Sequence, residues 1–517
     1  MQSVDSTFTS EAKDSVRDIA QRVLISWKKN YNAAISFFTI GVSTIGSSDL
    51  IKGDNDQVGD WDKYDYNDET SRVISIGLDR EMPQIWGGMR KTMADVVLDN
   101  TSGRFTREVD DDIGTSLVPR RPLKIYTGFK YNGIDNNLMK FVGLTTKPPK
   151  VDTRRGIAEL YANDFMDYLW NYEAEDSSMY SSSRSDEVIE DLLIDAGFAT
   201  SQYDLDAGIN IISFGIIEKG QKLGNIIQDI TEAEGGQFYQ DELGILRFEN
   251  RQHWTVSPHN VVSMPIHTSL VIDKEEPMND TIYNICEVKS SPLEKKEKQF
   301  VWGLQAPISI KANGKEEIWV DYDDPVQYVD TPQADGATSF YVANSQEDGE
   351  GTNKTSVVNL KSIDNFQKAS KLVFENTSSQ PIWLTELNIW ARPIQVVKEI
   401  LVREKDDSSV TAYGEKVLTI ENDYIQDEGF ARTVARMVVD DFGEPNNRLD
   451  LIIKAQPQLQ LGDLVSYGGS YYYLYQIQED LNASVGYIQT LKLIKRVINT
   501  YFRIGISTIG GIDKISP

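Results

Sequence analysis

The sequence predicts a β-rich α+β fold, and three observations lead to this prediction. Short runs of alternating apolar and polar residues, typical of half-buried strands, recur along most of the chain, for example at residues 123–129 and 138–144. Helical periodicity is confined to a few stretches, of which residues 186–196, 223–233 and 429–442 are the clearest. The 517 residues, 40% of them hydrophobic, suffice for about three or four domains with cores of their own.

The charge of the chain argues against one class of ligand. Asp and Glu number 79 against 52 Lys and Arg, an excess of 27 negative charges. Proteins that bind nucleic acid without sequence preference need a surplus of Lys and Arg to contact the phosphates. Nucleic acid is therefore a poor candidate ligand.

The cysteine content and the hydropathy of the chain indicate the kind of cellular compartment in which the protein folds. Cys286 is the one cysteine, so neither an internal disulfide nor a multi-thiolate metal site can form. The first residues lack the basic region and apolar run of a secretory signal, and no segment is apolar enough to predict a membrane span. We expect a protein that is made and folds in a reducing, aqueous compartment.

Residues 1–70 are expected to form an N-terminal arm. Ile19, Val23 and Trp27 recur at four-residue spacing, and residues 10–29 predict one amphipathic helix with a polar cap at Ser10. An isolated helix of this length is marginally stable in water. It must therefore dock either on its own body or on a partner.

The next segments predict two units. Strands separated by turns, among them the hairpin signal Asn132-Gly133, predict a first β domain over residues 71–180. Residues 181–184 are interpreted as a polar linker at the start of a compact α+β module over residues 181–252, which contains two helices and a closing hairpin.

The remainder of the chain predicts a divided β domain. Alternating strands with a Ser-Ser-Gln-Pro turn predict a small β-sandwich lobe at residues 331–394. Its ends lie within a strand region, so we interpret it as an insertion into a second β domain formed by residues 253–330 and 395–500. Residues 501–517 are expected to be a C-terminal arm.

Two peptides near opposite ends of the chain are almost identical. FTIGVSTIG at residues 38–46 and FRIGISTIG at residues 502–510 share seven of nine residues. Each is an extended β-branched peptide bounded by glycine, a form suited to adding a strand to an exposed sheet edge. A place on this protein's own surface explains each copy but not their likeness, so we expect equivalent docking sites on neighbouring subunits. The candidate assembly residues are Phe38, Ile40, Gly41, Ser43, Ile45, Gly46, Phe502, Ile504, Gly505, Ser507, Ile509 and Gly510.

Patterns for catalysis or metal binding are weak. His253, His259 and His267 have spacings that fit no helical or hairpin ligand pair, so solvated or capping histidines are expected. Residues 54–65 partly match a calcium loop, but Val58 stands where an oxygen ligand is needed, which favours a solvated acidic linker. No G-x-S-x-G, Walker or H-E-x-x-H motif occurs, and adjacent carboxylates do not by themselves supply the geometry of glycoside hydrolysis. We expect no enzyme, no catalytic residue, no metal and no cofactor.

The tryptophans of the predicted lobe allow two interpretations. Trp383 and Trp390, with Trp302 and Trp319 nearby, could line a sugar-binding face. Trp383 and Trp390 are an odd number of residues apart, so in one regular strand they face opposite sides. This spacing favours packing in the core of the lobe over a carbohydrate platform.

Several runs of sequence resemble one protein family. They are VVLDNTSGRFT at 96–106, PRRPLKIY at 119–126, KFVG at 140–143, the module at 186–251 with its closing GGQFYQDELGILRF at 235–248, ARTVAR at 431–436, RLDLIIK at 448–454, LQLGD at 459–463 and a closing strand at 487–495. In this order they are similar to the tail-hub or tail-tip proteins of long-tailed bacteriophages, often labelled minor tail or baseplate hub proteins. The resemblance implies two tail-tube-like β-barrel domains with the α+β module between them and the inserted lobe.

The same resemblance implies a function. Proteins of that family form a ring, usually a trimer, that joins the tail tube to the tip and lines or closes the DNA channel. The implied partners are further copies of the chain, a tail-tube or distal tail protein, other tip or fibre proteins and a tape-measure protein, with DNA only as passing cargo. The implied location is the tail tip of the virion, after synthesis in the host cytoplasm. An acidic channel wall would repel DNA and let it slide.

Two other functions stay open. One is a host-surface recognition protein whose inserted lobe binds carbohydrate. The other is a tail-associated cell-wall hydrolase.

Overall fold

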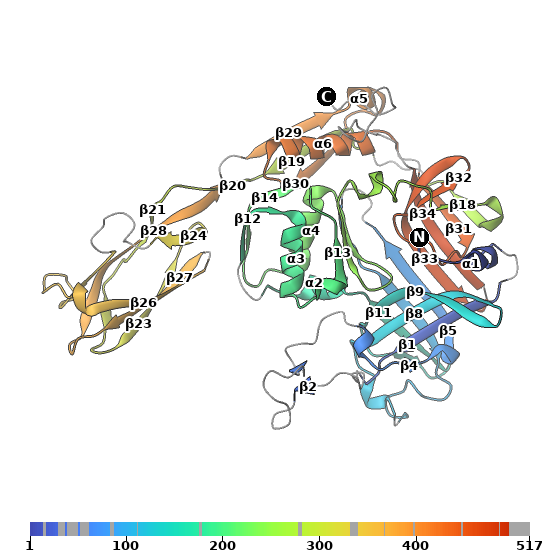
Figure 1. Cartoon of the computed structure of the whole chain (residues 1–517), viewed down its shortest axis with the longest axis horizontal. Coiled ribbons are helices and arrows are strands. Elements are labelled where there is room, and N and C mark those ends of the chain that lie inside the picture. Colours follow the sequence, from blue (N-terminus) through green and yellow to red (C-terminus); the bar gives the residue numbers. More distant parts are fainter. Residues whose placement is uncertain are drawn as a thin grey trace.

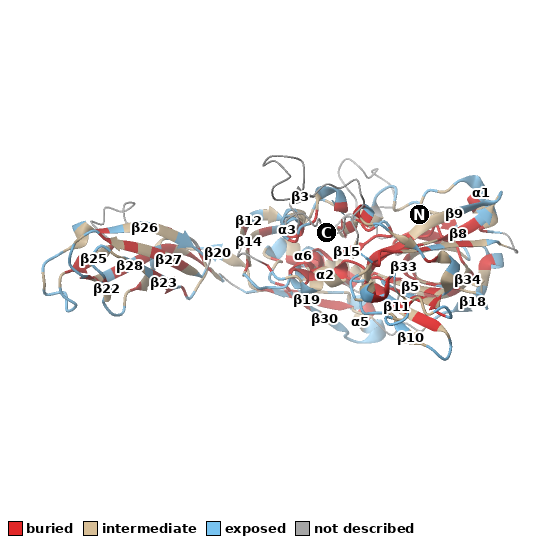
Figure 2. Cartoon of the chain, turned by 90° about the horizontal axis from the view of Figure 1, so that it is seen from below, coloured by how far each residue is buried: buried red, intermediate tan, exposed pale blue. Residues whose placement is uncertain are grey.

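The structure is a computed structural model. Its described residues form four connected parts: a large β-sheet region, an α+β module beside it, a β lobe at one end of an elongated molecule and a smaller unit that joins the lobe to the rest (Figures 1 and 2). The strands prevail over the helices, which confirms the predicted β-rich α+β class. The described residues are 1–13, 17–28, 61–82, 87–110, 112–174, 178–277, 282–330, 340–366, 368–396, 399–445, 448–484 and 486–495, together with the backbone of β2 (Phe37–Phe38) and β3 (Leu50–Ile51).

The large region is one 14-stranded sheet that combines strands from both ends of the chain. Its main path runs β18 (Val271–Glu275), β31 (Arg448–Lys454), β34 (Gly486–Lys495), β33 (Ser470–Asn482), β5 (Val73–Glu81), β7 (Met93–Asp99), β11 (Ile157–Asn163), β9 (Ile134–Thr145), β8 (Pro122–Tyr131), β1 (Ile19–Ile25) and β4 (Asn67–Asp68). Three short strands branch from this path: β10 (Lys150–Asp152), β17 (Met264–Pro265) and β32 (Leu464–Tyr467).

The sheet has two halves, which meet where β5 pairs with β33. The pairing is antiparallel and runs from Glu81 opposite Gln476 to Ser75 opposite Asn482. Each half has a hydrophobic core of its own, one around Leu98 and Leu123 and the other built mainly from the C-terminal strands. We call the β5–β33 pairing, with β7 beside it, the seam.

The strands and the hairpin predicted for the first half are confirmed. β8 and β9 form a ten-pair antiparallel hairpin across the predicted Asn132-Gly133 turn. Both turn residues have positive φ, 54° for Asn132 and 75° for Gly133, as the two-residue turn that matches strand twist requires.

The single helix predicted for residues 10–29 is wrong. Among the described residues of this segment, 10–13 and 17–28, the regular elements are the end of α1 (Ser6–Glu11) and the whole of β1, which pairs with β8 over seven residues from Ile19 to Ile25. Val23 and Ile25 are fully buried in the core. The β-branched residues of β1 gain more from this long-range pairing than from a solitary helix.

The module stacks helices against small sheets and pairs with the seam region. α3 (Ser185–Asp195) and α4 (Leu223–Glu234) match their predicted positions, and α4 ends where Gly235 adopts a left-handed φ of 62°. The remaining elements are α2 (Met166–Asn171), β12 (Ser178–Arg184), β13 (Tyr203–Leu205), β14 (Ile211–Ile217), β15 (Gln237–Gln240), β16 (Leu246–Glu249) and β6 (Gly88–Met89). Since β12 pairs with β14, the predicted polar linker at 181–184 is a strand.

The lobe is a sandwich of two sheets at the end of the molecule (Figure 1). One sheet assembles β20 (Leu293–Lys295), β21 (Gln299–Gly303), β22 (Ile308–Ile310), β24 (Val326–Asp330) and β25 (Tyr341–Asn344) along the long strand β28 (Ile382–Val396). The other consists of β23 (Lys315–Asp321), β27 (Ala369–Asn376) and β26 (Val358–Asn365). Its core extends from Ile310 to Ala391, so strands that precede the predicted boundary at residue 331 pack inside it.

A smaller unit joins the lobe to the rest. β19 (Ile285–Ser290) pairs with β29 (Ile400–Lys405) and with β30 (Val417–Glu421), and α6 (Glu428–Phe442) packs on this sheet. α5 (Asp407–Tyr413) lies between β29 and β30 in sequence. This unit has its own core, separate from that of the C-terminal half of the large sheet. The predicted domain boundaries stay predictions, and the cores define which strands pack together.

Candidate functional site

The candidate functional site is the seam, because charged residues from distant parts of the chain gather on both of its faces. On the inner face, Arg80 of β5 contacts the carboxylates of Glu242 and Glu479. Lys140 of β9 lies 3.4 Å from the Glu479 carboxylate. All four side chains are at most 5% exposed. Two cations and two anions therefore neutralise one another inside the protein.

The hydrogen bonds of this cluster connect three parts of the molecule. Glu242 lies in the turn between β15 and β16 and accepts a 2.9 Å hydrogen bond from Gln460 Nε2. Tyr487 of β34 donates to Glu479 and lies 2.7 Å from the Thr127 hydroxyl of β8. The module and both halves of the sheet thus meet at one buried charge network.

Burial and the neighbouring charges shift the pKa values of the network members, and the direction differs from one group to the next. Burial alone would raise the pKa of the Glu242 carboxyl, but Arg80 and Lys140 bring it below its usual range. Burial together with the positive charge of Arg80 lowers the pKa of Lys140. Burial, reinforced by the Glu479 carboxylate, raises the pKa of Tyr487 well above its ordinary value. Such a network fixes the relative positions of β5, β9, β33 and the β15–β16 turn.

The outer face of the seam is acidic. Asp79 and Glu81 of β5, Asp95 of β7 and Asp480 of β33 lie on the side opposite the buried residues of their strands. Within β5, β7 and β33, all of them described, the one Lys or Arg is Arg80, which faces inward. No base of these three strands therefore offsets the acids on the outer face.

A glycine lets two of these acids approach each other across the seam. Gly77 of β5 is opposite Asp480 on one side and Asp95 on the other. A Cβ atom at position 77 would lie 2.4 Å from an Asp95 carboxylate oxygen, so a larger residue there would displace this carboxylate. Burial, together with the charges of Asp480 and Glu159, raises the pKa of Asp95. This shift is the expected result of crowding like charges on one face.

The histidines form no metal site. Within the described ranges, no group of three or more His, Cys, Asp or Glu side chains is placed to hold a metal ion. His253 Nδ1 lies 2.7 Å from a carboxylate oxygen of Asp206, and its ring packs 3.8 Å from that of His259, centroid to centroid. His253 is 15% exposed, so the expectation of a solvated side chain is wrong for it, because Asp206 and the neighbouring rings hold it in place.

The sequence-predicted assembly peptides lie almost wholly outside the described residues. Only the backbone of Phe38 is described, in β2, which pairs with β3 in parallel. Most of the calcium-like loop at 54–65 is likewise outside the described residues, and Asp62 at its end forms an ion pair with Lys124 at 2.6 Å. The docking role predicted for these peptides therefore stays a prediction.

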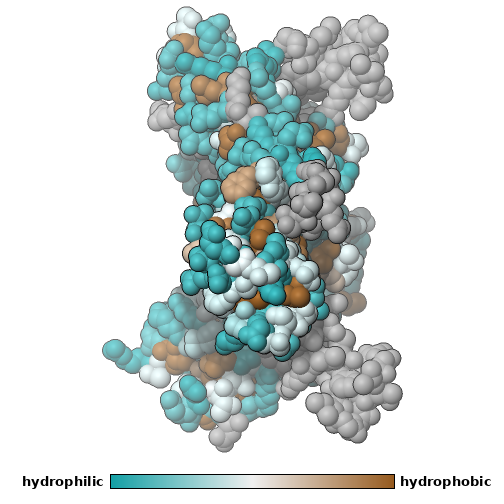
Figure 3. Space-filling model, turned by 90° about the vertical axis from the view of Figure 1, so that its left-hand side faces the viewer, coloured by the Kyte–Doolittle hydropathy of each residue, from teal (hydrophilic) through white to brown (hydrophobic). Residues whose placement is uncertain are grey.

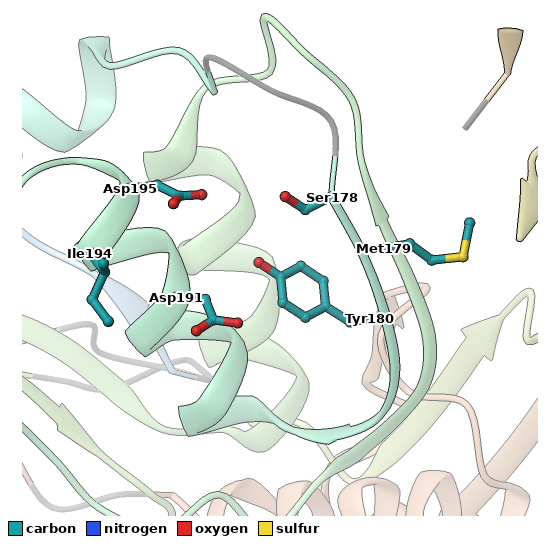
Figure 4. A pocket seen from close by; sticks show the side chains of 6 residues that line it. All are labelled: Ser178, Met179, Tyr180, Asp191, Ile194 and Asp195. Carbon is teal, nitrogen blue, oxygen red and sulfur yellow. The ribbon is translucent and has the colours of Figure 1, made fainter. Parts of the chain in front are cut away.

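A surface pocket of about 390 Å³ lies between β12 and α3 in the module (Figure 4). Tyr180 points from β12 toward Asp191 and Asp195 on α3, whereas Met179 points away from the helix. Burial and these two acids raise the pKa of Tyr180 to about 12. The pocket therefore presents two carboxylates, of Asp191 and Asp195, and the hydroxyls of Ser178 and Tyr180.

One buried carboxyl in the module should make stability depend on pH. Glu234 is 2% exposed, and its Oε1 accepts hydrogen bonds of 2.7 and 2.8 Å from the amides of Ile209 and Asn210. Burial outweighs these bonds and raises its pKa to about 7. The folded state therefore holds this proton more tightly than the unfolded state, and the resulting stability is present below about pH 4 and lost as pH rises through about 7.

We expect Glu234→Gln to reduce the fall in the free energy of unfolding between pH 5 and pH 8, by about 1–3 kcal/mol. Urea unfolding at a series of pH values measures this change. The exposed Glu108→Gln variant is the matched control and should keep the wild-type profile. An unchanged profile for Glu234→Gln would contradict the assignment.

Sequence reasoning missed the seam network, although part of its signal was present. Arg80 has the same strand parity as Ile76 and Leu78, which predicts an inward side chain. Its partner Glu242 is 162 residues away and Glu479 is 399 residues away, so no local pattern connects them.

The comparisons with known proteins concern the fold. The sequence matches no protein-family model and no curated protein. No helix in the described part of the chain is long and apolar enough to cross a bilayer.

The chain is similar to solved structures of tail proteins. One is a 43 kDa tail protein of prophage MuSo2 from Shewanella oneidensis, with TM-score 0.43, 8% identity, and coverage of 83% of this chain and 95% of that one. Another is a tail protein from Neisseria meningitidis MC58, with TM-score 0.44, 10% identity and coverage of 83% and 93%. A third is a type VI secretion component from E. coli, itself described as similar to bacteriophage T4 tail proteins, with TM-score 0.36, 8% identity and coverage of 83% and 74%.

These structural neighbours are tail proteins or tail-like secretion components, as the sequence resemblance predicts. TM-scores below 0.5 do not establish a common fold over the whole chain. The candidate site at the seam therefore rests on the contacts between residues of this chain and not on the structural neighbours.

Proposed function

We propose that the chain is a structural, non-enzymatic component of a phage tail, acting as a hub or tip ring that joins the tail tube to the tip. The observation that carries the proposal is the seam. Two β halves, each with its own core, pair edge to edge into one sheet, and a buried charge network locks the module onto the same place. A sheet that is stabilised in this way is suited to form part of a tail, which must resist mechanical force.

The outer face of the seam is proposed to line a channel for DNA. Its acids, among them Asp79, Asp95 and Asp480, would repel phosphate, so DNA would pass without adhering. In this arrangement the two halves act as tube-like barrels, and a ring of three copies places six halves around the axis. The proposed partners are further copies of the chain, a tail-tube or distal tail protein, tip or fibre proteins and a tape-measure protein.

The two repeat peptides are proposed as equivalent strands that dock on neighbouring subunits. Their likeness, seven of nine residues, is unexplained by any role within one copy. An extended peptide with β-branched residues at alternate positions adds readily to an open sheet edge.

Deleting residues 501–517 tests the proposed assembly role. We expect a folded chain, with an unchanged thermal unfolding midpoint, that is not incorporated into assembled particles, because one of the two docking peptides is gone. The matched control deletes residues 512–517 and keeps the repeat intact, so incorporation should remain normal. Normal incorporation of the longer deletion would contradict a docking role for the repeat.

A further inference from the structure

The long strand β28 of the lobe changes, partway along its length, which of its residues face the core. Buried residues occupy positions 382 and 384 of β28, and then positions 387, 389 and 391. The change of parity coincides with an irregularity in the pairing of β25 with β28, where Ala343 is opposite Leu384 and Val342 is opposite Glu386. One extra residue in a strand turns every later side chain to the other face.

This irregularity places Trp383 and Trp390 on the same face of the sheet. The expectation that they face opposite sides and pack in the core is wrong, because it assumed a regular strand. Both lie outside the core, and Trp390 is 45% exposed. The two tryptophans are seven residues apart, and the irregularity takes up one of these residues. Six steps of extended strand span about 20 Å, so the two indoles mark the ends of an elongated strip.

The strip alternates aromatic and polar groups. At one end Phe300 of β21, 53% exposed, packs edge-on against Trp390 with ring centroids 5.9 Å apart. Between the two tryptophans, the exposed residues of β28 are Glu386 and Asn388. Gly303, opposite Asn388, is a position where a Cβ would meet the Phe300 ring at 2.8 Å, so a larger residue there would displace this ring. We call Trp383, Asn388, Trp390 and Phe300 the aromatic strip.

The chemistry of the strip favours a sugar chain over other ligands. Exposed aromatic rings present flat apolar faces that stack on the C–H faces of pyranose rings, and an amide side chain between them hydrogen-bonds with hydroxyl groups. The lobe from residue 293 to 396 holds 15 Asp and Glu against 10 Lys and Arg, a net charge of −5. On the outer face of β28, Glu386 lies between the two tryptophans, and Arg392 beyond them is paired with Glu297 at 3.8 Å, an arrangement that disfavours polyanions. The face of the molecule seen from the lobe end is largely hydrophilic, with scattered hydrophobic side chains (Figure 3).

We propose that the aromatic strip binds an uncharged polysaccharide chain, with Trp390 and Phe300 stacking at one end and Trp383 at the other. The site stands on the lobe alone and is independent of the proposed hub role. It lies at the end of the molecule away from the large sheet, where a surface glycan can reach it (Figure 1).

The test uses the full chain and Trp390→Ala, with neutral oligosaccharides of six sugars as probes: cellohexaose, maltohexaose, xylohexaose and chitohexaose. Isothermal titration should give saturable binding of at least one probe, and the Trp390→Ala variant should bind it about 10-fold or more weakly. An unchanged circular dichroism spectrum and melting midpoint show that the variant is folded.

The lobe supplies its own control. Trp319 lies on the outer face of the opposite sheet, is 56% exposed and stacks on Phe366 at 5.6 Å, so Trp319→Ala removes an equally exposed indole. Its affinity for the probe should equal that of the wild type. Three results would each overturn the proposal: no probe binds, Trp390→Ala binds like the wild type, or both variants lose affinity equally.

Discussion

Replacing Arg80 with methionine should lower the free energy of unfolding by about 3–5 kcal/mol. The guanidinium is 3% exposed and contacts Glu242 and Glu479, which are themselves 5% and 2% exposed. Methionine fills much of the same volume, but it leaves two buried carboxylates with only Lys140 to offset them. Unpaired buried charge, rather than lost packing, is the cause of the expected loss.

Urea unfolding of Arg80→Met measures the effect, and two variants identify its cause. Arg22 forms an ion pair with Asp68 in which the two side chains are 53% and 50% exposed, so Arg22→Met should cost less than about 1 kcal/mol. The double variant Arg80→Met/Glu479→Gln restores the balance of charge and should recover part of the loss. A cost below about 1 kcal/mol for Arg80→Met would show that the network does not hold the seam together.

Gly462→Ala should be the second most damaging substitution, with a cost of about 2–4 kcal/mol. Gly462 has a left-handed φ of 78°, and a Cβ there would lie 1.7 Å from the Trp254 ring. Trp254 cannot easily withdraw, because the Tyr473 hydroxyl donates a 2.8 Å hydrogen bond to its carbonyl and the Tyr473 ring packs edge-on against the indole. The segment after the module is thereby pinned to the C-terminal half of the sheet.

Gly468 separates the two causes of this cost. It also has a positive φ, 58°, but a Cβ there would meet nothing within 4 Å. Gly468→Ala should therefore show only the conformational cost, about 1 kcal/mol. Thermal and urea unfolding of both variants provide the comparison, and equal costs would mean that the Trp254 contact contributes nothing.

Local structure could be predicted from the sequence wherever local signals were decisive. α4 combines helical periodicity with Gly235, which ends the helix. The β8–β9 hairpin has an Asn-Gly turn, a dipeptide that favours two-residue hairpin turns. β1 could not be predicted, because its partner β8 is about a hundred residues away and the spacing of its apolar residues also fits a helix. The long-range pairing with β8 therefore determines that this segment is a strand and not a helix.

The same reason explains what was missed at the candidate sites. The inward position of Arg80 follows from strand parity, but its partners come from the module and from β33. The common face of Trp383 and Trp390 depends on an irregularity that no residue type in β28 marks. In both cases the sequence contains the side chains, and the tertiary pairing determines what they do.

A cryo-electron microscopy map of the assembled particle, in which this chain is located, tests the hub role most directly. We expect a closed ring of copies on the tail axis, with Asp79, Asp95 and Asp480 facing the central channel and the lobes directed outward. A single copy located away from the axis, or a ring whose seam acids face outward, would contradict it.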